Sequence, residues 1–131
     1  WLAKPTDDYS STALEIMDNH YSKSTLMNYT DNNEVVLAGI LEIVKIELSA
    51  SLKDLIDNFE KGDLKGINAA GHKMYGTAVS SGMGILSKMA TVLEKLTVFD
   101  DAELLEKLDL LSKEIELVLA QVEIQKQSLA V

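Results

Sequence analysis

The feature that most constrains this chain is an aliphatic repeat at three- and four-residue steps, running from about position 37 to position 122. This spacing gathers apolar side chains on one face of an α-helix, and it does not match the two-residue alternation of a half-buried strand. The single proline, Pro5, lies outside the repeat, so no proline interrupts a helix there. The chain is 47% hydrophobic but only 5% aromatic, a mix that favours helices over strands. We therefore expect an all-α fold.

Polar and glycine residues divide the repeat into four stretches. Three aspartates, Asp31, Asp63 and Asp100, lie shortly before an apolar stretch in the sequence. Each of them predicts the start of a helix. Lys61–Gly62 predicts the end of the first stretch, and the glycine-containing run at 80–84 predicts a break after the second. Four amphipathic helices with short connections predict an antiparallel up-and-down four-helix bundle, preceded by a short helical or extended segment.

The length of 131 residues suits one domain with a real core. Residues 1–24 are polar and rich in Ser, Thr and Asp, so we expect a linker there, with a turn or two of helix at 13–17. The folded domain is expected at residues 25–128.

The net charge of −9 disfavours nucleic acid and anionic membrane surfaces as partners, because both are negatively charged. The chain has no cysteine, which excludes disulfides and thiolate chemistry and fits a reducing compartment. It contains no apolar run long enough to cross a bilayer and no secretory signal pattern. These features predict a cytoplasmic domain without direct membrane contact.

The chain has two histidines, His20 and His72. His20 falls in the polar linker and is interpreted as a solvated side chain. His72 lies roughly 130° around its helix from the apolar stripe, so it should face solvent in mid-helix. Gly76 follows one turn later and costs the helix about 1 kcal/mol relative to alanine. A glycine beside an exposed imidazole indicates close approach by another protein.

The segment from Lys61 to Lys88 contains four lysines and one aspartate, hence a net charge of +3, and the rest of the chain holds −12. A positive field around an exposed imidazole suits a phosphoryl group. Lys65 and Lys73 lie on the same broad face as His72. From these features alone, a structural helical domain with an incidental histidine is the alternative.

The stretch at 70–82 reads Ala-Gly-His-Lys-Met-Tyr-Gly-Thr-Ala-Val-Ser-Ser-Gly. It resembles the signature of histidine phosphotransfer (HPt) domains, in which a histidine is followed by an apolar residue, a glycine, a hydroxyl residue and a later glycine. The matching residues are His72, Met74, Gly76, Thr77 and Gly82. The similarity covers about residues 24–125. The family has a lysine or arginine three residues after the histidine, where this chain has Tyr75.

The resemblance implies a phosphorelay intermediate without kinase activity of its own. Nε2 of His72 would accept a phosphoryl group from a receiver aspartate and pass it to another receiver. Lys73 and Lys65 would stabilise the phosphoryl group. The docking face would comprise Asn68, Ala69, Tyr75, Gly76 and Val79. No cofactor is expected on this chain, because the Mg²⁺ would belong to the receiver, and the domain is expected to act as a monomer within a larger protein.

The segment Trp1–Pro5 is similar to the Lys-Pro region near the end of receiver domains. Together with the missing initiator methionine, this similarity predicts the C-terminal module of a hybrid sensor histidine kinase. If that kinase has a membrane anchor, the anchor is expected elsewhere in the longer chain.

Two other functions are weighed against phosphotransfer. A degenerate, non-phosphorylated adaptor that docks receivers is favoured by Tyr75. A metal- or haem-binding bundle is disfavoured, because the chain has two histidines and no cysteine, and Ala69 occupies the place of the glutamate in a Glu-x-x-His pair. No metal ligands are therefore expected.

Overall fold

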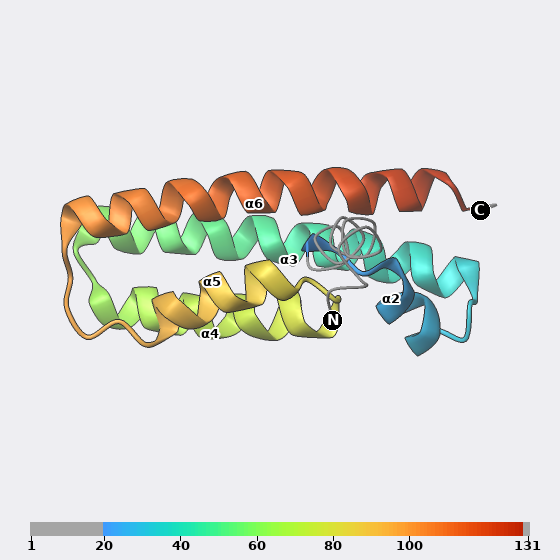
Figure 1. Cartoon of the computed structure of the whole chain (residues 1–131), viewed down its shortest axis with the longest axis horizontal. Coiled ribbons are helices and arrows are strands. Elements are labelled where there is room, and N and C mark those ends of the chain that lie inside the picture. The colour runs from blue at the N-terminus through green and yellow to red at the C-terminus, as the bar shows by residue number, and fades with distance from the viewer. Residues whose placement is uncertain (1–19, 130–131) are drawn as a thin grey trace, which may run out of the picture.

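The computed structural model describes residues 20–129, and this part of the chain is helical, without a β-strand. The prediction of an all-α fold is confirmed. Five helices follow one another: α2 (Lys23–Tyr29), α3 (Glu34–Lys61), α4 (Leu64–Ser80), α5 (Gly84–Glu94) and α6 (Asp101–Gln127). Figure 1 shows the chain reversing its direction at each turn from α3 to α6, so that these helices lie lengthwise beside one another.

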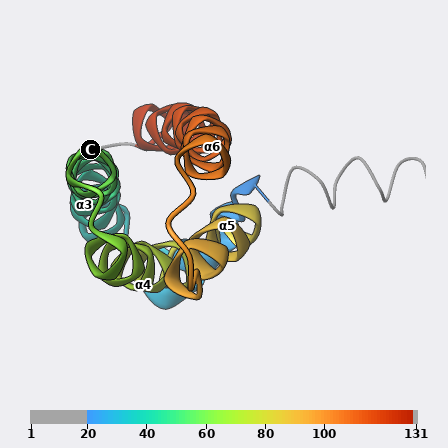
Figure 2. The same ribbon diagram turned by 90° about the vertical axis from the view of Figure 1, so that its left-hand side faces the viewer.

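Viewed along the long axis, α3, α4, α5 and α6 surround a common centre (Figure 2). The aliphatic stripe of each helix turns inward there, as the three- and four-residue spacing predicts. The largest fully buried side chains are Leu37, Leu41, Leu48, Leu55, Ile67, Met74, Met83, Leu86, Leu93, Leu104, Leu111 and Val118. This core holds the outer face of α4 in place.

The helix boundaries follow the predicted polar residues with one correction. Asp63 and Asp100 accept from the backbone N–H groups of Gly66 and Glu103 at 2.9 and 3.0 Å, and Gly62 ends α3 in the left-handed conformation. The predicted start at Asp31 is wrong. Asn33 caps α3 instead, accepting from the N–H of Val36.

The reason for this correction lies in the backbone of the α2–α3 turn. Asp31 and Asn32 have positive φ angles of 51° and 61°. A left-handed conformation is not that of an N-cap, whose backbone is extended. The capping role therefore passes to Asn33, the first residue after the turn with an extended backbone.

α2 is tied to the turn between α4 and α5. The N–H of Ser22 donates to the carbonyl oxygen of Gly82 at 2.8 Å. Gly82 has a φ of 76°, and a Cβ on it would lie 2.6 Å from Oγ1 of Thr25. Only glycine combines this conformation with so close an approach, which explains the predicted break at 80–84.

Most of the predicted linker, including the helical turns expected at 13–17, lies outside the described residues. Its last residues, 20–24, contact the bundle, and Tyr21 is buried. The boundary between linker and domain at residues 24 and 25 stays a prediction. None of the helices in residues 20–129 combines the length and apolar character needed to cross a lipid bilayer.

Candidate functional site

The candidate site lies on the outer face of α4. The side chain of His72 is 72% exposed, as its position opposite the apolar stripe predicts. The helix buries Ile67, Gly71 and Met74 on its other side. Mid-helix placement holds the imidazole on a rigid element while leaving one edge of the ring open to solvent.

One edge of the His72 ring is occupied by a carboxylate from α5. Nδ1 of His72 lies 2.8 Å from Oε2 of Glu94. An ionised carboxylate only accepts hydrogen bonds, so Nδ1 carries the proton and donates it to this contact. In the neutral ring, the lone pair is then on Nε2. The contact selects the tautomer whose solvent-facing nitrogen is a nucleophile.

Two residues of α4 bring Glu94 into reach. A Cβ on Gly71 would lie 2.9 Å from the backbone N of Glu94 and 3.0 Å from the carbonyl oxygen of Ala90, so glycine permits the close approach of α5. The amide of Asn68 donates to the carbonyl oxygens of Leu93 and Leu96 at 2.8 and 3.1 Å. These bonds hold the C-terminal end of α5, where Glu94 lies, against α4.

Of the five residues expected to form the docking face, four are exposed and one is half-buried. Ala69, Tyr75, Gly76 and Val79 are exposed, and a Cβ on Gly76 would meet nothing within 4 Å. Asn68 is half-buried, and its amide is engaged by α5. The exposed members surround His72 on the same side of α4, and the open space outside Gly76 leaves room for another backbone.

Lys65 and Lys73, expected to stabilise a phosphoryl group, are both exposed. Lys65 lies seven residues before His72, nearly in line with it and about 10 Å away along the helix axis. Lys73 is adjacent in sequence and therefore about 100° further round the helix. The side chain hydrogen-bonded to the ring of His72 belongs to Glu94 and to neither lysine.

Sequence reasoning missed Glu94 as a site residue, because a contact across 22 positions leaves no periodic trace. It also misjudged His20, whose Nδ1 lies 2.6 Å from Oε2 of the buried Glu114. The sequence does indicate that Glu114 is buried, since it lies three residues after Leu111 and four before Val118, on the apolar stripe of α6. A carboxylate on that stripe needs a partner.

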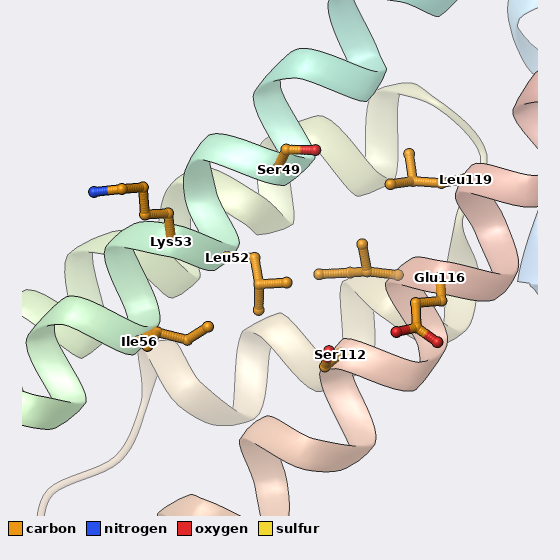
Figure 3. A pocket seen from close by; sticks show the side chains of 8 residues that line it. Ser49, Leu52, Lys53, Ile56, Ser112, Glu116 and Leu119 are labelled. Atoms are coloured by element: carbon orange, nitrogen blue, oxygen red, sulfur yellow. The ribbon is translucent and has the colours of Figure 1, made fainter.

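A groove elsewhere in the described residues lacks comparable chemistry. The groove between α3 and α6 shown in Figure 3 is lined by aliphatic side chains, two serines, Lys53 and Glu116, with no histidine. In the described residues, no group of three or more His, Asp or Glu side chains is placed to hold a metal ion.

Comparison with known proteins gives the family of the bundle that carries this site. A family model described as the Hpt domain matches residues 39–125, which contain His72 and Glu94. Neither the search of curated proteins nor the search of solved structures found a significant match. Hpt domains carry out histidine phosphotransfer in phosphorelays, where they interact with response-regulator receiver domains. The match covers well over half of the chain, which therefore belongs to the Hpt domain family.

Proposed function

We propose that His72 is the phosphoacceptor of a phosphorelay: it takes a phosphoryl group from the aspartate of one receiver domain and passes it to another. The observation that carries this proposal is the contact of Nδ1 with Glu94 at 2.8 Å in a side chain that is 72% exposed. In the neutral ring this contact places the lone pair on Nε2, the nitrogen that a nucleophilic imidazole uses.

In the proposed step, the Nε2 lone pair attacks the phosphorus of the aspartyl phosphate in line. The N–P bond forms as the P–O bond to the receiver aspartate breaks, and the carboxylate leaves with that electron pair. The positive charge that develops on the ring is shared through Nδ1–H with Glu94, which acts as a positioning residue. Transfer to the second receiver is the reverse reaction, so the chain is a carrier without kinase activity.

Lys65 and Lys73 supply positive charge on either side of His72 for the transferred group. Tyr75 takes the place of the family's usual lysine or arginine, so the two lysines carry this task from other positions. Ala69, Tyr75, Gly76 and Val79 contact the receiver, and Asn68 acts behind them by holding α5. The Mg²⁺ of the reaction belongs to the receiver, and this chain binds no cofactor.

We extend the proposal to the setting of the domain. The helices α3 to α6 act as an antiparallel up-and-down four-helix bundle, which the chain reversals in Figure 1 support. The domain functions as a cytoplasmic monomer at the C-terminal end of a hybrid sensor kinase, for which the support is the similarity of residues 1–5 to the end of a receiver.

The test uses the two histidines as a matched pair. Incubation with a phosphorylated receiver should transfer acid-labile phosphate to the wild-type chain and to His20→Gln, but not to His72→Gln. Circular dichroism verifies that both variants fold. Labelling of His72→Gln would overturn the assignment. A wild-type chain that binds the receiver yet stays unlabelled would instead identify the adaptor function that Tyr75 favours.

A further inference from the structure

An apolar groove runs between α3 and α6 on the outside of the bundle. The residues that line its first hollow, shown in Figure 3, include Leu52, Ile56 and Leu119. Those that line a second hollow include Phe59, Phe99 and Leu105. Ile56 is 41% and Leu105 60% exposed. Apolar side chains left half-exposed along a groove are typical of a surface that binds another segment.

The two hollows follow one another along the same pair of helices. α3 and α6 run in opposite directions (Figure 1), so the second half of α3 lies along the first half of α6. On α3, Ile56 of the first hollow is one turn before Phe59 of the second. From Ser49 to Gly62 the groove follows α3 for about 20 Å, the length of a helix of about 13 residues.

The lining of this groove suits coverage by a helix. The hydroxyl of Ser49 donates to the carbonyl oxygen of Lys45 at 2.9 Å, so an apolar side chain can cover it without leaving an unpaired donor. The rings of Phe59 and Phe99 are stacked with their centroids 5.9 Å apart, which gives the second hollow an aromatic wall. An amphipathic helix binds a groove of this kind through its apolar face.

The charged side chains along the groove leave an excess of negative charge. Nζ of Lys53 lies 3.1 Å from Oδ2 of Asp57, so this cation is already paired within the chain. The other charged lining residues are the exposed Glu60, Lys61, Asp101 and Glu116. Among residues 20–129, none of these four belongs to an ion pair. Three carboxylates against one ammonium group attract a cationic partner.

We propose that the groove between α3 and α6 binds an amphipathic helix of another protein, whose apolar face is flanked by lysine or arginine. A second copy of this chain fits less well, because it brings the same acids and a net charge of −9. Neither hollow is lined by α4 or α5, the helices of His72 and Glu94, so the partner leaves His72 open to a receiver. The inference goes beyond phosphotransfer and does not depend on it.

The probe is a fluorescent peptide of about 14 residues made of leucine and lysine, with leucine at three- and four-residue steps. Anisotropy should show that it binds the whole chain, and that a peptide of the same composition in scrambled order binds about tenfold more weakly. Ile56→Ser with Leu105→Ser should weaken binding of the ordered peptide by about tenfold. Ile46→Ser with Ile124→Ser, the matched control, changes exposed residues of the same two helices outside both hollows and should leave binding unchanged.

A second set of measurements tests the charge of the partner. A peptide with glutamate in place of lysine should not bind. Glu116→Gln should weaken binding of the lysine peptide, while Glu106→Gln, at an exposed position of α6 outside both hollows, should not.

Three results would overturn the proposal. The first is equal binding of the ordered and scrambled peptides, or an equal loss in both pairs of serine variants. The second is binding of the glutamate peptide as tight as that of the lysine peptide. The third is a wild-type chain that dimerises in light scattering and becomes monomeric in Ile56→Ser with Leu105→Ser, which would identify a second copy as the occupant.

Discussion

At the scale of single residues, the two histidines make the same contact in opposite surroundings. Each Nδ1 faces a glutamate oxygen, at 2.8 Å for His72 and 2.6 Å for His20. His72 is 72% exposed and its partner Glu94 31%, whereas the values for His20 and Glu114 are 21% and 7%. A receiver can therefore approach the ring of His72, while the His20 pair joins two parts of the fold.

Glu94→Gln tests the positioning role of the carboxylate. The amide can also donate to Nδ1, so the tautomer with the proton on Nδ1 is no longer enforced. We expect phosphotransfer to His72 to slow by about 10- to 100-fold, the range found when a metal-bound imidazole loses the carboxylate that orients it. Nitrogen NMR of the His72 ring should show Nδ1–H in the wild type and a mixture of tautomers in the variant.

The matched control for this change is Glu106→Gln, an exposed position on α6. It removes the same charge from the chain without touching α4 or α5. If Glu94→Gln leaves both the transfer rate and the tautomer unchanged, Glu94 is a surface partner of His72 without a role in positioning it.

At the scale of the elements, two glycines give α4 different properties on its two sides. A Cβ on Gly71 would press on the backbone of α5, at 2.9 Å from the N of Glu94, while a Cβ on Gly76 would meet nothing within 4 Å. One glycine lets a neighbouring helix of the same chain approach, and the other leaves an open surface beside His72.

Gly71→Ala and Gly76→Ala should therefore change stability in opposite directions. Gly76→Ala should stabilise the domain by up to about 1 kcal/mol, because alanine has the higher helix propensity. Gly71→Ala should destabilise it by about 1–3 kcal/mol, the cost of overpacking. Urea denaturation measures both, and a stabilised Gly71→Ala would show that α5 can shift without cost.

The amphipathic pattern predicted the helices well but overstated their buried faces. Val92 of α5 and Leu105 of α6 fall on the three- and four-residue spacing of their helices, yet they are 48% and 60% exposed. A spacing rule identifies the side of a helix that is apolar. Only the neighbouring helices decide how much of that side is covered, and α5 leaves the groove with α6 partly open.

At the scale of the whole molecule, the start of the described chain is part of the fold. Tyr21 is 4% exposed and donates a hydrogen bond to Gln125, and burial raises the pKa of Tyr21 from 10.0 to about 12. The same end of α6 is also joined to α3, where Nζ of Lys126 lies 2.5 Å from Oε2 of Glu42. Segments about a hundred residues apart thus meet along α6.

The raised pKa of Tyr21 predicts a loss of stability at high pH. Below pH 10 the tyrosine is protonated in both the folded and the unfolded chain, so its contribution is complete. Between pH 10 and about 12 the unfolded chain releases the proton first, which lowers the free energy of unfolding. The two-unit shift corresponds to about 2–3 kcal/mol. Urea denaturation from pH 8 to pH 12 measures this loss.

Two phenylalanine variants isolate the contribution of Tyr21. Tyr21→Phe should remove this part of the pH dependence. Tyr29→Phe, at a position that is 79% exposed, should keep the wild-type profile. If both variants follow the wild-type curve, other groups cause the loss and the hydroxyl of Tyr21 ionises as easily in the folded chain as in the unfolded one.

The sequence by itself determined the all-helical class, the ends at Gly62, Asp63 and Asp100, and the exposure of His72. These features depend on spacing within a few residues, because one helical turn is a local property. Only the tertiary structure decided that Glu94 would hold His72, that Glu114 would bind His20 and that α5 and α6 would leave a groove. Such contacts join residues 22 to 94 positions apart, and they arise only when packing of the whole core sets how closely the helices approach.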